Sequence, residues 1–130
     1  MNDNPTDPQE QCKLAEKYGG DENASQEDLE KAVYWFKEAA EQGHALAQVN
    51  LGTHYKTGMG VAQNHKKAAF WWTVSASQDD PMAQFYLGIC CMKGEGVPKN
   101  EQMGIYWITK AANQGLPHAQ AYLRDRKSPW

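Results

Sequence analysis

Residues 47–76 read AQVNLGTHYKTGMGVAQNHKKAAFWWTVSA, and residues 83–112 read AQFYLGICCMKGEGVPKNEQMGIYWITKAA. Both stretches carry Ala-Gln, Leu-Gly, Gly-x-Gly-Val, Asn and Trp at the same places, 36 positions apart. Self-similarity at one fixed shift is the sequence signature of a repeat architecture. The chain is therefore predicted to be an array of like units, each burying its apolar face against its neighbours.

The same register continues on both sides of these stretches. Toward the C-terminus, Ala83-Gln84 recurs as Ala119-Gln120. Toward the N-terminus the shift becomes 37, and Leu14 aligns with Leu51. The predicted units are residues 7–43, 44–79 and 80–115, followed by a terminal half-repeat at 116–126, and together they form a single domain over residues 1–130.

Within each unit the apolar residues follow helical spacing, as in Ala47, Leu51 and Tyr55. Seven helices are expected, at 8–18, 28–42, 45–57, 65–78, 81–93, 101–114 and 117–126. The predicted fold class is all-α, an α-α superhelix: a right-handed solenoid of about 3.5 antiparallel helix-pair repeats.

Local signals mark the expected helix ends. Residues whose side chains can accept a hydrogen bond from the first turn are predicted N-caps: Asp7, Asp28, Asn64, Asp80 and Asn100. Ser25 with Asp28 loosely resembles a capping box, which would start that helix earlier. Glycine can adopt the left-handed conformation that ends a helix, so it is predicted to do so at Gly43, Gly58, Gly94 and Gly115. Trp71 and Trp107 are predicted to fill the space between helix pairs.

These motifs resemble the Sel-one-like repeat family, a subgroup of the tetratricopeptide-like α-solenoids. The family pattern runs Ala-x-x-x-Leu-Gly-x-x-Tyr-x-x-Gly-x-Gly-Val, then Lys-Ala-x-x-Trp, then Ala-Ala-x-x-Gly. Residues 47–76 match it almost throughout, and residues 83–115 depart from it at Cys91, Met103 and Gly104. The resemblance is strong over residues 28–123 and weak over residues 7–27.

The resemblance implies a non-enzymatic scaffold or adaptor that binds another protein or peptide. It leaves open a bacterial toxin-immunity protein with one cognate toxin. A secreted branch with two bridging cysteines in each repeat is linked to β-lactam binding or hydrolysis, and this defines an alternative from another class. The chain departs from that branch because His54 and Tyr55 stand 36 positions before Cys90 and Cys91.

Charge and composition limit the partner class. Residues 1–43 carry 4 basic and 11 acidic side chains, whereas residues 44–130 carry 9 and 5. Neither part has the dense basic stripe of a nucleic-acid binder. No apolar run is long enough to span a membrane, and no N-terminal signal peptide is visible. Three cysteines with one adjacent pair give no disulfide framework, so a cytoplasmic location is expected.

The sequence predicts no catalytic residues, no metal site and no cofactor. Four histidines are scattered, and closely spaced zinc ligands are absent. The Gly58-x-Gly60 and Gly94-x-Gly96 segments follow no strand and precede no Gly-Lys-Ser/Thr, which disfavours a phosphate-binding loop. A Cys/His pair formed by Cys90 and His54 would need direct contact, which repeat spacing does not ensure.

A partner is expected in the concave groove, because the first helix of each pair lines that face in superhelical repeats. By analogy with tetratricopeptide geometry, the inward positions include Gln9, Cys12 and Glu16 in the first unit. The predicted partner-binding residues are Leu46, Val49, Thr53 and Lys56 in the second unit, and Met82, Phe85, Ile89, Met92 and Lys93 in the third. The third unit is apolar and rich in Met, which suits an adaptable binding surface. The oligomeric state stays open, since the half-repeat and Trp130 are also candidate contacts.

Overall fold

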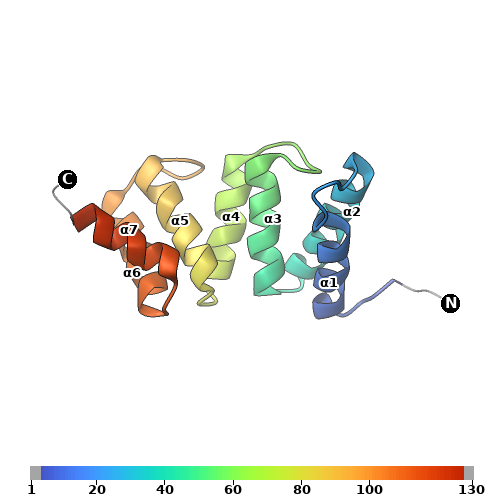
Figure 1. The fold of residues 1–130 in the computed structure, drawn as a ribbon, viewed down its shortest axis with the longest axis horizontal. Coiled ribbons are helices and arrows are strands. Elements are labelled where there is room, and N and C mark those ends of the chain that lie inside the picture. Colours follow the sequence, from blue (N-terminus) through green and yellow to red (C-terminus); the bar gives the residue numbers. More distant parts are fainter. Residues whose placement is uncertain (1–3, 128–130) are drawn as a thin grey trace.

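The computed structural model describes residues 4–127, a range that contains helices and no strand. Seven helices follow one another along it (Figure 1). Their bounds are α1 Pro8–Gly19, α2 Gln26–Glu41, α3 Ala45–Thr57, α4 His65–Ala76, α5 Pro81–Lys93, α6 Glu101–Asn113 and α7 Pro117–Lys127. The prediction of an all-α superhelix is confirmed. Trp130 lies outside the described residues.

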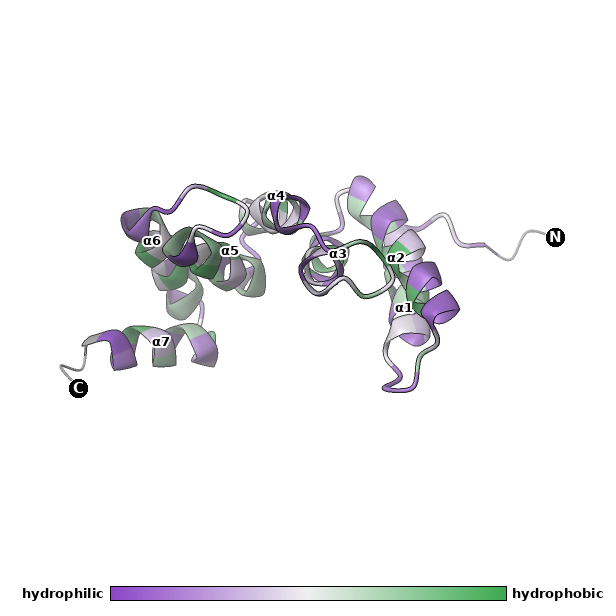
Figure 2. Cartoon of the chain, turned by 90° about the horizontal axis from the view of Figure 1, so that it is seen from above, coloured by the Kyte–Doolittle hydropathy of each residue, from purple (hydrophilic) through white to green (hydrophobic). Residues whose placement is uncertain are grey.

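The helices form one row, in which each packs mainly against the helix before it and the helix after it. Helices α1 and α7 lie at opposite ends of this row (Figure 1). Seen from above, the row is an arch with α1, α3, α5 and α7 toward its inner side and α2, α4 and α6 toward its outer side (Figure 2). The first helices of the repeats therefore share one face.

Most of the predicted helix ends are confirmed. The side chains of Asp7, Asn64, Asp80 and Asn100 each accept a hydrogen bond from a backbone N–H in the first turn of the helix that follows. Gly58 and Gly94 end α3 and α5 with the same positive φ of 75°. The prediction that Asp28 caps its helix is wrong: Ser25 Oγ accepts from the Asp28 N–H at 3.1 Å, so α2 begins at Gln26.

The space between repeats is filled by Trp72 rather than by its neighbour. Trp72 is 2% exposed, whereas Trp71 and Trp107 are half-buried and pack at the edge of the core. The Trp72 indole lies directly over Gly52, where any Cβ would overlap it, and its Nε1 donates to the Val49 carbonyl at 3.1 Å. Its ring also lies 5.0 Å from that of Tyr86 in α5. The prediction that Trp71 and Trp107 fill this space is corrected accordingly.

Ile108 takes the place of Trp72 in the next repeat. It is fully buried, and it lies over Gly88 as Trp72 lies over Gly52. Gly104 also faces Gly88, so α5 and α6 approach each other through two glycines. The departure from the family pattern at Gly104 thus permits a close helix crossing.

A set of glutamines connects the repeats through hydrogen bonds. Gln48 is buried, and its Nε2 donates to the carbonyl of Ala40 at 3.0 Å, while its Oε1 accepts from Gln78 at 2.8 Å. The same arrangement recurs at Gln84, which donates to Ala76 and accepts from Gln114. Buried amides need such partners because an unpaired polar group is costly inside a protein. The Ala-Gln motif of the repeat is explained by this role.

Candidate functional site

The predicted partner-binding residues of α3, on the inner side of the arch, differ in how far their side chains are exposed. Leu46 is 48% exposed, Lys56 is exposed and Thr53 is half-buried, so all three are accessible. Val49 is only 5% exposed and belongs to the core. The prediction is corrected at Val49, because its side chain is occupied by packing within the chain.

The apolar stripe predicted on α5 is partly used by the protein itself. Phe85, Ile89 and Met92 are half-buried and pack against a cluster formed around Ile108 and Ala119. Helix α7 closes over the stripe: the Phe85 ring lies 6.4 Å from the Tyr122 ring. These residues are therefore partly covered by α7, and their binding role stays a prediction.

The two remaining predicted residues of the third unit differ in burial. Met82 is half-buried against the main core, whereas Lys93 is exposed. Burial and the charge of Glu95 raise the pKa of Cys90, whereas the charges of Lys56 and Lys93 lower it, so charges of both signs surround this part of α5.

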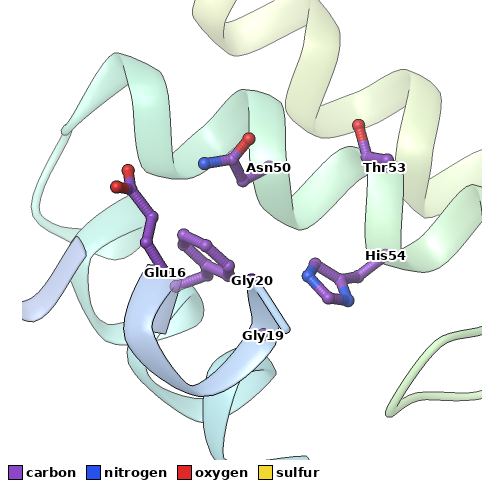
Figure 3. A pocket seen from close by; sticks show the side chains of 7 residues that line it. Glu16, Gly19, Gly20, Asn50, Thr53 and His54 are labelled. Carbon is purple, nitrogen blue, oxygen red and sulfur yellow. The ribbon is translucent and has the colours of Figure 1, made fainter. Parts of the chain in front are cut away.

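A pocket of about 200 Å³ lies between α1, α2 and α3. It is lined by Glu16, Gly19, Gly20, Phe36, Asn50, Thr53 and His54 (Figure 3). Two of these residues, Glu16 and Thr53, are predicted from the sequence to lie on the inner face, at equivalent positions 37 residues apart. The pocket itself was missed, because it depends on how a side chain of α2 and the imidazole of His54 meet these two positions.

Exposed aromatic side chains gather on the other side of the arch. Tyr34, Phe70 and Tyr106 are each about half exposed, on α2, α4 and α6. Each stacks on or meets edge-on the tryptophan that follows it, with ring centroids 4.9–5.2 Å apart. Their spacing of 36 residues is visible in the sequence and could have identified them as a second repeated surface.

The cysteines are buried and free, and their surroundings disfavour the reactive thiolate. Burial, together with the Glu16 charge, raises the pKa of the Cys12 thiol to about 12. Burial and the Glu95 charge raise the pKa of Cys90 to about 11. Nucleophilic cysteines need a lowered pKa and access to solvent. In the part of the chain that the structure describes, no three His, Cys, Asp or Glu side chains group as metal ligands would.

We expect the thiols of the folded protein to be alkylated by iodoacetamide at pH 8 at least tenfold more slowly than those of the protein in denaturant, because the pKa of Cys12 and Cys90 is raised. Since the folded state disfavours the thiolate, the free energy of unfolding should also fall as the pH rises above about 9. Mass spectrometry of alkylated protein over time measures the first effect. Equal rates in both states would mean that the cysteines are exposed.

Three repeats of one family account for most of the chain. The Sel1 repeat matches residues 11–44, 45–80 and 81–116. This chain belongs to the Sel1 repeat family. Sel1 repeat folds generally mediate protein–protein interactions, and Sel1 repeat proteins are typically non-enzymatic scaffolds. Comparison with curated protein sequences finds no match.

Solved structures agree with the Sel1 repeat assignment. A Sel1 repeat protein from Oxalobacter formigenes is 34% identical with a TM-score of 0.81, over 92% of this chain and 90% of that one. The protective antigen c5321 of uropathogenic Escherichia coli is also 34% identical with a TM-score of 0.81, and the match covers 88% of this chain but 24% of that one. Helicobacter pylori cysteine rich protein B shares the fold at 24% identity with a TM-score of 0.70. The match covers 88% of this chain and 90% of that one. No helix within residues 4–127 has the length and apolarity needed to cross a membrane.

Proposed function

We propose that this Sel1 repeat chain is an adaptor that binds another protein or peptide on the inner face formed by α1, α3, α5 and α7. The observation that carries the proposal is the pocket between α1, α2 and α3, which brings together side chains from two successive first helices. Accessible residues continue from it along α3, at Thr53 and Lys56, to Lys93 at the end of α5. Preformed concave sites with a few polar groups are typical binding sites.

The charge distribution supports a protein partner, and the free thiols support a cytoplasmic location. The acidic N-terminal part and the basic remainder of the chain lack the concentrated positive charge that nucleic acid or anionic membranes select. The proposed partner is therefore a protein segment. Three buried, unpaired thiols suit a reducing compartment such as the cytoplasm.

Photo-crosslinking tests which side of the arch the partner uses. We expect p-benzoylphenylalanine at position 53, on α3, to give a covalent adduct with the partner in cells that express the protein. The same amino acid at position 73 should give none, since Thr73 is exposed on α4, next to Phe70 on the outer side. The two sites begin as threonines, so the substitution is matched. An excess of protein without the crosslinker should reduce the amount of adduct, because it competes for the partner.

An adduct at position 73 and none at 53 would contradict the proposal. It would move the interaction to the outer side, where Tyr34, Phe70 and Tyr106 are exposed. Unfolding curves of both labelled variants show that each retains the fold.

A further inference from the structure

The pocket between α1, α2 and α3 is rich in hydrogen-bond acceptors that the protein leaves unused. The Glu16 carboxylate pairs with no cation in the described range, and its one polar contact is with Cys12 Sγ at 3.6 Å. A thiol is a weak donor, so most of the accepting capacity of the carboxylate remains free. Glu16 thus brings an exposed negative charge to the pocket.

His54 adds a second acceptor whose orientation is fixed. Its Nδ1 lies 2.8 Å from the carbonyl oxygen of Met59. A carbonyl can only accept, so Nδ1 carries the hydrogen, and Nε2 of the neutral imidazole is left with a lone pair. The other ring nitrogen is turned toward the pocket in Figure 3. The loop after α3 therefore holds the imidazole with its accepting side toward the pocket.

Asn50 completes the polar lining. It is half-buried, and no group among the described residues forms a hydrogen bond with its side-chain amide. Figure 3 shows this amide between Glu16 and Thr53. Phe36 is only 3% exposed, so it adds little more than a small apolar contact to the lining, with its ring 5.5 Å from the ring of His54. The lining thus combines a carboxylate, a free imidazole nitrogen and a free amide with a largely apolar wall.

We infer that this pocket binds the guanidinium group of an arginine side chain in the partner, an inference that rests on the proposed function. A planar guanidinium presents several donors at once, which suits acceptors that are spread over separate side chains. The apolar walls fit the methylene stem of the side chain. The 11 acidic and 4 basic side chains of residues 1–43 attract a cation and repel an acidic segment.

Peptide titration of the 15N-labelled protein tests this inference. The probes are acetyl-Gly-Ser-Arg-Ser-Gly-amide and the same peptide with citrulline, which has nearly the shape of arginine without its charge. At millimolar concentration the arginine peptide should shift the backbone amide signals of Glu16, Gly19, Gly20, Asn50 and His54. The citrulline peptide should bind at least tenfold more weakly, because charge-assisted hydrogen bonds are about twice as strong as neutral ones.

Two variants locate the interaction. Glu16→Gln should weaken binding of the arginine peptide about tenfold, while Glu41→Gln should change it less than twofold, since Glu41 is exposed at the end of α2 and does not line the pocket. Both substitutions remove one negative charge, so they separate local recognition from net charge. Melting temperatures of both variants should equal that of the wild type.

Three results would overturn the inference: no shifts at the pocket, equal affinity of both peptides, or equal weakening by the two variants. None of them would affect the proposed function if the partner still crosslinks from position 53. Conversely, arginine binding in the pocket with crosslinking only from position 73 would leave the pocket intact and reject the proposed inner-face function.

Discussion

Trp72→Ala is expected to lower the free energy of unfolding by about 3–5 kcal/mol, the range for removing a large buried aromatic side chain. Trp72 fills the space over Gly52 and contacts Tyr86 in the following repeat. Its removal would leave a cavity between two repeats and abolish the hydrogen bond to the Val49 carbonyl. Because each repeat is stabilised by its neighbours, the loss should weaken the whole array.

The adjacent residue provides the control. Trp71 is half-buried, so Trp71→Ala should cost about 1–2 kcal/mol, roughly half or less of the value for a fully buried ring. Urea unfolding followed by circular dichroism at 222 nm measures both variants. A larger loss from Trp71→Ala than from Trp72→Ala would show that the rotation of α4 about its axis differs from that in the structure.

Gln84→Leu is expected to cost about 2 kcal/mol, although leucine is apolar and similar in size. Gln84 is fully buried, and its amide joins three helices by donating to Ala76 at the end of α4 and accepting from Gln114 at the end of α6. Leucine would remove both hydrogen bonds, each of which contributes about 0.5–1.5 kcal/mol to stability. Thermal and urea unfolding give the change in stability.

Gln120→Leu is the matched substitution. Gln120 occupies the equivalent position in α7 and donates to the Ala112 carbonyl at 3.0 Å, but it is exposed, so water can replace the bond. Its loss should cost less than about 1 kcal/mol. If both variants were equally stable, the buried glutamines would contribute nothing beyond their apolar contacts.

Much of the fold could be predicted because the helix ends have local causes. Helices α3 and α5 begin and end at the predicted residues, where a cap, a proline or a left-handed glycine stands. The choice between Trp71 and Trp72 could not be predicted. Adjacent residues on a helix differ by about 100° in direction, and both lie near the apolar stripe. Which one enters the core depends on the rotation of α4 against Gly52, a contact between helices.

The inner face was harder to predict than the fold for a similar reason. Helical spacing correctly places Phe85, Ile89 and Met92 on one side of α5, but their burial depends on the position of α7. The pocket depends on the loop after α3, whose Met59 carbonyl orients His54. Spacing identifies residues on one helix face, whereas these features arise where separate segments meet.

The glutamine hydrogen bonds have a consequence for the evolution and engineering of the array. Each unit contributes a carbonyl to the unit after it, and Gln42, Gln78 and Gln114 each donate to the first helix of their own unit. A cassette cut before His44 and before Asp80 would carry a complete set of donors and acceptors. Its deletion would present the Ala40 carbonyl to Gln84, and its duplication would present that of Ala76 to a second Gln48. Unequal recombination at these boundaries can thus change the length of the solenoid while every buried glutamine keeps its partners.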